Sequence, residues 1–262
     1  MYTTGWNGQI DAVNSVHANY NMLYPFAAAR SGAEGAVSWA AHYSIPSNIV
    51  AARAAGRRIV MSTGGAGQGI NFHSRYVSQN FVTSIVAINT SFGGTLASPR
   101  IDGVDFNTFE AEAVPNVTEY LWMFGELKRL FGSNFIISSP PAPWKDQDKE
   151  MIRQALAKNL MDYAGPQYYD GPGLEQPDYI VNSVRDWVNN VAGGDASKIT
   201  VGFGFSPGSA NYSSQAQIQS TWDRIEAEFP SIRGAFLWQH QTDKTSGWPI
   251  GVNVVPDWKA LG

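Results

Sequence analysis

The acids and the amide of residues 101–110 are the side chains of this chain best placed to do chemistry. The segment reads Ile-Asp-Gly-Val-Asp-Phe-Asn-Thr-Phe-Glu. Asp105, Asn107 and Phe109 are spaced by two and share one face of a strand, whereas Glu110 falls on the other face. A carboxyl at the end of a strand can pass a proton to a bound molecule or orient it through hydrogen bonds. The segment therefore predicts a site in which Phe109 takes the last inward place and Glu110 comes one residue too late.

Two orientations are open to Glu110. It reaches the inner face only if Thr108 or Phe109 forms a β-bulge, which shifts the strand face by one residue, and bulges cluster beside active sites. Otherwise Glu110 faces solvent or the following helix, and the site could bind a molecule without donating a proton to it. The position of this one carboxyl therefore separates an enzyme from a binding protein.

Strand-length apolar runs that could position this segment recur along the chain. Most are continuous rather than alternating, which is typical of parallel strands covered on both faces. They are residues 2–6, 22–26, 58–62, 103–106, 134–138, 160–163 leading into 167–169, 199–203 and 234–238. Helices are predicted between them, at residues 47–55, 117–131, 146–159, 178–191 and 214–229. No linker divides the chain, so we expect an α/β protein with one domain, a single (β/α)8 TIM barrel over residues 1–262, whose site lies where the strands end.

Composition excludes several classes of function. The net charge is −4, which gives no basic surface for nucleic acid, and no apolar run is long enough to span a membrane. There are no cysteines, so disulfides and thiolate chemistry are excluded. The four histidines lie far apart without ligand spacing, so we expect no metal and no cofactor. The glycine-rich residues 64–69 lack the lysine of a phosphate-binding loop and are interpreted as a loop over a cleft. We expect a monomer.

Four segments in order resemble the motifs of glycoside hydrolase family 18, the chitinases and endo-β-N-acetylglucosaminidases with their non-catalytic relatives. Residues 62–65, Ser-Thr-Gly-Gly, are similar to the S-x-G-G motif that ends the third strand. Residues 102–107 are similar to the start of the D-G-x-D-x-D-x-E motif of the fourth strand. Residues 166–170 resemble the Q-x-Y-N/D motif of the sixth strand, and residues 234–238 resemble the eighth strand with its tryptophan beneath the substrate. The resemblance covers nearly the whole chain.

This resemblance implies a site and a mechanism. In the family, the glutamate that ends the fourth-strand motif protonates the glycosidic oxygen, and the N-acetyl group of the sugar attacks the anomeric carbon. The resemblance implies catalytic positions at Asp105, Asn107, Tyr169 and, with a bulge, Glu110. It implies substrate-binding positions at Asp102, Gln167, Asp170, Trp238, Gly64 and Gly65. Two positions depart from the motif: Asn107 stands where an aspartate orients the acetamide, and Phe109 stands where the glutamate belongs.

Three functions follow from this comparison. The first is a protein that binds an oligosaccharide or polysaccharide, a β-linked glycan containing N-acetylglucosamine, with little or no hydrolase activity. The second is an active endo-acting hydrolase in which Glu110 is the acid, Asp105 adjusts its pKa and Asn107 aligns the acetamide. The third is a protein-binding inhibitor with a blocked cleft, which an open aromatic cleft would contradict. Secretion is compatible with the resemblance, although no signal peptide is recognisable in the sequence.

One more segment departs from the family. Many family chitinases carry a sequence of the type Met-Ala-Pro-Glu after the fifth strand, whereas this chain has Pro-Pro-Ala-Pro-Trp at residues 140–144. The acidic residue is absent and Trp144 is nearby. This pattern is expected where stacking on a ligand persists after hydrolysis is lost.

Overall fold

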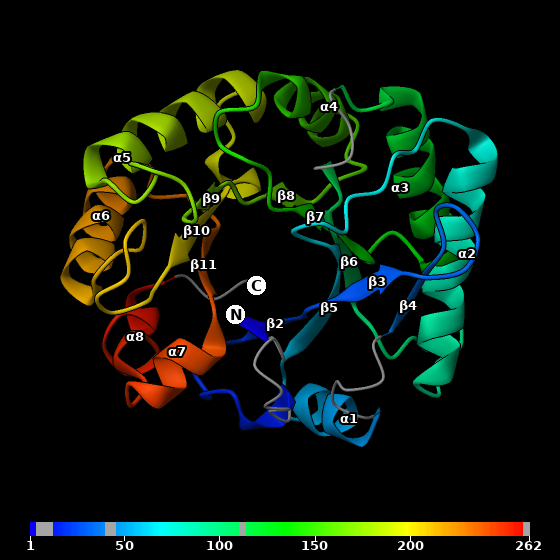
Figure 1. Cartoon of the computed structure of the whole chain (residues 1–262), viewed down its shortest axis with the longest axis horizontal. Coiled ribbons are helices and arrows are strands. Elements are labelled where there is room, and N and C mark those ends of the chain that lie inside the picture. Colours follow the sequence, from blue (N-terminus) through cyan, green and yellow to red (C-terminus); the bar gives the residue numbers. More distant parts are fainter. Residues whose placement is uncertain (4–12, 40–45, 110–113, 259–262) are drawn as a thin grey trace.

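Parallel strands form the centre of the molecule. The computed structural model describes residues 1–3, 13–39, 46–109 and 114–258. One group of neighbouring strands contains β1 (Tyr2–Thr3), β2 (Met22–Pro25), β5 (Arg58–Gly64), β6 (Gly103–Asn107), β7 (Ile136–Ser139) and β8 (Tyr163–Ala164). A second group contains β9 (Gln167–Tyr168), β10 (Thr200–Gly204) and β11 (Gly234–Trp238). A parallel bridge from Ala164 to Ile199 joins the groups, and β1 contacts β11. The strands therefore close into a barrel (Figure 1).

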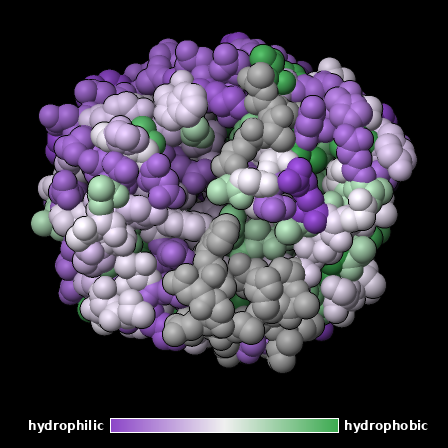
Figure 2. Space-filling view, viewed as in Figure 1, coloured by the Kyte–Doolittle hydropathy of each residue, from purple (hydrophilic) through white to green (hydrophobic). Residues whose placement is uncertain are grey.

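Helices surround the barrel as an outer ring (Figure 1). They are α1 (Pro46–Ala54), α2 (Arg75–Ser91), α3 (Val117–Phe131), α4 (Asp146–Ala157), α5 (Pro177–Asp186), α6 (Gln215–Glu228), α7 (His240–Thr245) and α8 (Pro249–Asn253). Short helical segments cover Val13–Ser15, Trp187–Val191, Ala196–Lys198 and Val255–Asp257. None of the described helices combines the length and apolar character needed to cross a membrane. In the same view, the surface over α4, α5 and α6 is mainly hydrophilic, and apolar residues come to the surface nearer the middle of the face (Figure 2).

The predicted (β/α)8 barrel is confirmed, and the elements that were not predicted include α2, the short helices α7 and α8, and a β-hairpin. Helix α2 carries a buried apolar stripe that includes Val77, Phe81 and Ile85, and Ser74 caps it by accepting from the Val77 amide. It has no acid in its first turn and no base in its last, so the charge signals of a helix are missing from its sequence. The predicted helix 178–191 is α-helical only to Asp186 and continues as a π-helical turn over Trp187–Val191.

The β-hairpin that was missed is antiparallel; it consists of β3 (Ala28–Arg30) and β4 (Val37–Trp39) and is inserted after β2. Ala28 of β3 pairs in parallel with Thr63, near the end of β5. The hairpin therefore lies beside the C-terminal end of the third barrel strand. The Arg30 guanidinium donates to the Gly67 carbonyl at 3.0 Å. The hairpin is thereby attached to the glycine-rich loop.

Successive residues of β6 serve the two layers of the barrel. Phe106 points outward, where its ring lies 5.1 Å from Phe81 of α2 and 4.8 Å from Phe124 of α3. Asp105 points inward and accepts a hydrogen bond from Tyr2. This alternation follows from the two-residue period of a strand. It places apolar side chains against the helices and leaves the barrel interior for the polar groups of the site.

Candidate functional site

Asp105 lies inside the barrel at the centre of three hydroxyl groups. Its carboxylate, 1% exposed, accepts hydrogen bonds from Tyr2 Oη at 2.6 Å, Ser138 Oγ at 2.7 Å and Ser62 Oγ at 3.1 Å. Burial raises the pKa of Asp105 to about 6, and the three hydroxyls oppose that shift because they stabilise the charged form. This carboxyl can therefore be protonated or ionised near neutral pH.

Two amide side chains lie at the strand ends beyond this acid. Asn107 is the last residue of β6, and its Oδ1 is 3.5 Å from Nε2 of Gln167 on β9. The same Gln167 amide donates to the Pro140 carbonyl. Both amides border the cavities described below, so they offer donors and acceptors to a ligand.

The predicted positions Gly64 and Gly65 shape the wall of the site. Gly65 N donates to the Asn107 carbonyl at 2.7 Å, and both glycines have positive φ, +84° and +98°. A Cβ on Gly64 would lie 2.2 Å from the Asn107 carbonyl oxygen, and one on Gly65 would lie 2.2 Å from Cζ of Phe26. Only glycine allows the third strand to close this tightly on its neighbours. Ala66, the next residue, lines the cavity.

A row of aromatic rings forms one side of the site. The Trp238 and Tyr169 ring planes differ by 9° with centroids 6.0 Å apart, and Tyr212 continues the row at 6.3 Å and 24°. Phe26 meets Trp238 edge-on at 5.1 Å. Burial raises the pKa of Tyr169 well above its usual value, so its hydroxyl stays protonated. Tyr169 borders the larger of the two cavities described below.

The two remaining acids of the predicted site lie in different places. Asp170 joins the site: it borders the cavity beside Tyr169, has φ of +63°, and accepts from Tyr212 Oη at 2.6 Å. Asp102 does not join it. Its carboxylate accepts from Arg53 at 3.1 Å and from the Ile59 amide at 2.8 Å, before β6 begins. The prediction that Asp102 binds ligand is therefore corrected, because this acid ties β5 to β6 at the opposite end of the strand.

The strand count past Asn107 was also wrong. Strand β6 ends at Asn107, and the next residue, Thr108, hydrogen-bonds Tyr120 of α3 at 2.9 Å. The Phe109 ring packs on the same Tyr120, with centroids 5.4 Å apart. The Phe109 side chain therefore packs against α3, although it also borders the same cavity as Asn107. The two-residue alternation applies only within a strand, so it does not assign the inward place to Phe109. The predicted acid Glu110 lies outside the described residues.

Two cavities meet above the strand ends. The first, of about 450 Å³, is bordered by Trp238, Tyr169 and Asp170, and the second, of about 370 Å³, by Phe109, Lys145 and Asp148. Four residues border both cavities: Asn107, Ala142, Trp144 and Gln167. The two cavities therefore form one open cleft. Each is within the size range of small-molecule sites.

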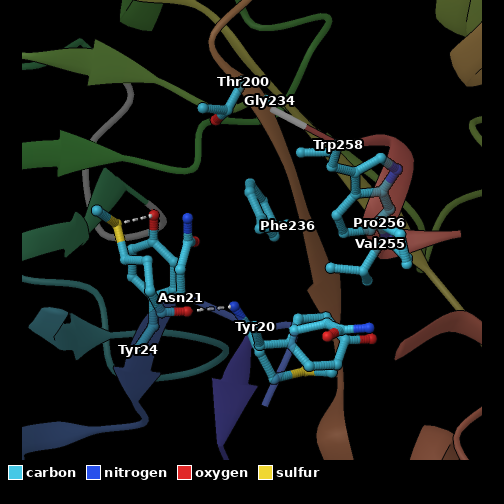
Figure 3. Close-up of a pocket in the computed structure, with 13 residues that line it drawn as sticks. Tyr20, Asn21, Tyr24, Thr200, Gly234, Phe236, Val255, Pro256 and Trp258 are labelled. Carbon is cyan, nitrogen blue, oxygen red and sulfur yellow. Dashed lines mark hydrogen bonds between the residues drawn. The ribbon is translucent and has the colours of Figure 1, made fainter. Parts of the chain in front are cut away.

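A separate cavity of about 280 Å³ lies at the opposite end of the barrel (Figure 3). Tyr24 of β2, Phe236 of β11 and Trp258 near the C-terminus are among the residues that line it. No predicted site residue borders it. Across the described ranges, no group of three His, Cys, Asp or Glu side chains could hold a metal ion.

Sequence reasoning missed Tyr2, Ser138 and Tyr212, which hold the two acids of the site. Each is an isolated hydroxyl residue, and each acts on an acid far away in the sequence, so no local motif indicates it. The predicted strand ends were the one signal that could have grouped them, because the ends of parallel strands meet at one face of the barrel.

Comparison with known proteins gives structural relatives only. No family model and no curated protein matches the sequence. A family 18 chitinase from Chromobacterium violaceum has 19% identity and a TM-score of 0.78, covering 93% of this chain and 78% of its own. A family 18 chitinase from Pseudoalteromonas aurantia has 20% identity and a TM-score of 0.74, covering 97% and 98%. The chain has the fold of the family 18 glycoside hydrolases.

The family 18 fold also includes a protein that is described as an inhibitor. A xylanase and α-amylase inhibitor protein, determined with trehalose, has 17% identity and a TM-score of 0.74, and the match covers 96% of both chains. The resemblance drawn from the four motifs is thus confirmed for the fold. Since chitinases and an inhibitor share this fold, the fold alone does not decide between the three functions.

Proposed function

We propose that this protein binds a β-linked glycan containing N-acetylglucosamine in the cleft above Trp238. The aromatic row carries the proposal, because flat rings with a polar group beside them suit the apolar face and the hydroxyls of a sugar. Trp238 and Tyr169 lie within 9° of parallel, and Tyr169, whose hydroxyl can hydrogen-bond an acetamide oxygen, borders the cavity. Asn107 and Gln167 supply further hydrogen bonds to the glycan. Asp105 lies deeper in the barrel, where it orders the hydroxyls of Tyr2, Ser62 and Ser138.

The open cleft argues against the inhibitor function. A protein that binds other proteins through surface loops has no need of an open aromatic cavity, and this one keeps a cavity of about 450 Å³ over Trp238. The likeness of fold to an inhibitor supports that alternative, and no feature of the cleft favours it.

Hydrolysis is the second candidate, and one observation favours it. Phe109 packs on Tyr120, so the chain leaves the strand after Asn107 and the motif glutamate need not be replaced by Phe109. In this candidate, Glu110 protonates the glycosidic oxygen, Asn107 aligns the acetamide and Asp105 adjusts the pKa of Glu110. General acid catalysis of this kind contributes a factor of roughly 10²–10⁴ to the rate.

The two candidates are separated by measuring binding and turnover on the same proteins. Binding of chitotetraose is measured by calorimetry and hydrolysis of a fluorogenic chitotrioside by fluorescence, for the wild type, Glu110→Gln, Trp238→Ala and Tyr169→Phe. Trp122→Ala is the matched control, because Trp122 on α3 packs against Arg75 of α2 and borders neither cavity of the cleft. We expect Trp238→Ala and Tyr169→Phe each to weaken chitotetraose binding at least about tenfold, a change of about 1.4 kcal/mol in the binding free energy. We expect no turnover by the wild type.

Either other result overturns the proposal. Turnover that is lost in Glu110→Gln would establish a hydrolase. A wild type that binds no chitooligosaccharide would remove both candidates.

A further inference from the structure

Met22 borders the cavity at the N-terminal end of the barrel, on the opposite side from the cleft. Its side chain is 5% exposed, and the exposed residues Asn19 and Asn21 line the same cavity of about 280 Å³. The chain has six methionines, and Met1 also borders this cavity. The other four are at most 1% exposed and border none of the three cavities described above: Met61, Met123, Met151 and Met161. A molecule the size of water can therefore reach the Met22 thioether through the cavity.

Two tyrosine hydroxyls meet at the Met22 sulfur. Tyr24 Oη donates to Sδ at 3.0 Å (Figure 3) and Tyr163 Oη donates to it at 2.8 Å, while the two hydroxyl oxygens lie 2.6 Å apart. Burial raises the pKa of both tyrosines, so both hydroxyls keep their protons. A thioether sulfur is only a weak acceptor, so these buried donors are poorly satisfied. A sulfoxide oxygen at the same place would satisfy them better.

Hydrogen peroxide supplies that oxygen without any other reactant. A lone pair of the sulfur attacks one peroxide oxygen, so that an S–O bond forms while the O–O bond breaks. The proton of the attacked oxygen passes to the departing hydroxide, which leaves as water. The sulfur is oxidised to the sulfoxide and the peroxide is reduced to water. In an apolar core the polar product would bury an unpaired oxygen, whereas here two hydroxyls can donate to it.

The Met22 side chain is connected by packing to the cleft. The Tyr24 ring stacks on the Tyr2 ring, with centroids 4.7 Å apart and planes that differ by 13°. Tyr2 Oη donates to Asp105 at 2.6 Å, and the Tyr2 ring lies 5.8 Å from the Trp238 ring. An extra oxygen in a closely packed interior displaces its neighbours. A displacement of Tyr24 is therefore passed to Tyr2, which contacts both Asp105 and Trp238.

We propose that Met22 is an oxidation site, at which hydrogen peroxide in this cavity forms a methionine sulfoxide held by the hydroxyls of Tyr24 and Tyr163. The oxidised side chain then weakens ligand binding in the cleft at the other end of the barrel. The oxidation itself is independent of the proposed function, whereas its effect on glycan binding rests on that function. The proposal is therefore tested in two stages.

Tandem mass spectrometry of the folded protein after exposure to hydrogen peroxide tests the oxidation site, because it assigns the added oxygen to each methionine separately. We expect Met22 to be oxidised at least about tenfold faster than Met61, which is fully buried on β5. Tyr163→Phe keeps the ring and removes one hydroxyl, so it should slow the oxidation of Met22 severalfold. Tyr168→Phe is the matched control and should not slow it, because the Tyr168 hydroxyl bonds Ser183 of α5 and Tyr168 borders none of the three cavities.

Binding of chitotetraose tests the effect on the cleft. Calorimetry is run on the wild type, Met22→Leu and Met61→Leu, each before and after exposure to peroxide. We expect oxidation to weaken binding about fivefold in the wild type and in Met61→Leu, at the lower end of typical coupling between two sites. Met22→Leu nearly keeps the volume of the side chain and has no sulfur there, so it should bind equally well before and after exposure.

Each contrary outcome concerns one part of the proposal. If Met22 is oxidised no faster than Met61, or equally fast in Tyr163→Phe, the oxidation site is overturned. If Met22 is oxidised and binding by the wild type does not change, or falls as much in Met22→Leu, the effect on the cleft is overturned. If the unoxidised wild type binds no chitotetraose, the proposed function fails and the effect on the cleft fails with it, while the mass spectra still decide the oxidation site.

Discussion

Asp102, which precedes β6, and Asp105, within it, lie three residues apart and have different surroundings. Asp102 meets a cation and a backbone amide, with Arg53 at 3.1 Å and the Ile59 amide at 2.8 Å. Asp105 meets three hydroxyls and, among the described residues, no side-chain cation, and its pKa rises to about 6. An ion pair fixes charge in place, whereas a cage of hydroxyls leaves a buried carboxyl able to change protonation. The difference supports the proposal that Asp105 belongs to the site, whereas Asp102 ties β5 to the start of β6.

Replacing Asp105 should have the largest effect on stability. Asp105→Ala leaves the hydroxyls of Tyr2, Ser62 and Ser138 buried without their acceptor. We expect a loss of about 3 kcal/mol in the free energy of unfolding at pH 5, from the typical cost of unsatisfied buried groups. Urea denaturation measures it. Asp105→Asn is the control, because its amide oxygen still accepts, and it should cost less than half as much. Equal losses in the two variants would show that the hydroxyl cage contributes little.

The pH dependence of stability gives the next largest effect. Asp105 has a folded pKa of about 6 against an ordinary value of 3.8, so the folded protein binds the proton more tightly than the unfolded chain. Stability contributed by this group is therefore full below about pH 4 and is lost as the pH rises to about 6, by about 2–3 kcal/mol. Subtracting the profile of Asp105→Asn isolates this contribution. A difference that is flat from pH 4 to 7 would contradict the raised pKa.

Replacing Asp102 should have the smallest effect. Asp102→Asn keeps an acceptor for the Ile59 amide and loses the charge opposite Arg53 and Arg58, whose side chains are 28% and 64% exposed. We expect a loss of about 1 kcal/mol in the free energy of unfolding that shrinks at high salt, because a partly exposed ion pair is screened. Glycan binding should not change. A loss of glycan binding without a loss of stability would return Asp102 to the site.

The barrel could be predicted from the sequence because its strands are buried on both faces and appear as continuous apolar runs. Helix α3 was predicted to the residue, since Gly132 ends it and its apolar stripe is regular. Helix α2 was missed because it has no acid in its first turn and no base in its last turn to mark its ends. The hairpin of β3 and β4 was missed because its strands have three residues each, too few to show a period.

The site was predicted less completely than the fold. Asn107, Gln167, Tyr169, Asp170 and Trp238 come together because motif residues at the ends of parallel strands share one face of the barrel. Asp102 was misplaced because a linear motif does not say at which end of a strand each residue lies. Phe109 was misplaced because the two-residue alternation of a strand was extended beyond Asn107, where β6 ends. Tyr2 and Tyr212 were missed because their partners are distant in the sequence.

The contact of the first strand with the last has a consequence for folding. Tyr2 of β1 donates to Asp105, and its ring lies 5.8 Å from that of Trp238 on β11. These contacts join parts of the chain that are far apart in sequence, and contacts of that kind form slowly because long loops must close first. A partly folded chain in which β1 has not yet paired with β2 lacks the Tyr2 hydroxyl at Asp105. The environment of the acid is therefore completed only when β1 has joined the sheet, so the addition of this strand can be followed in refolding experiments through the titration of this carboxyl.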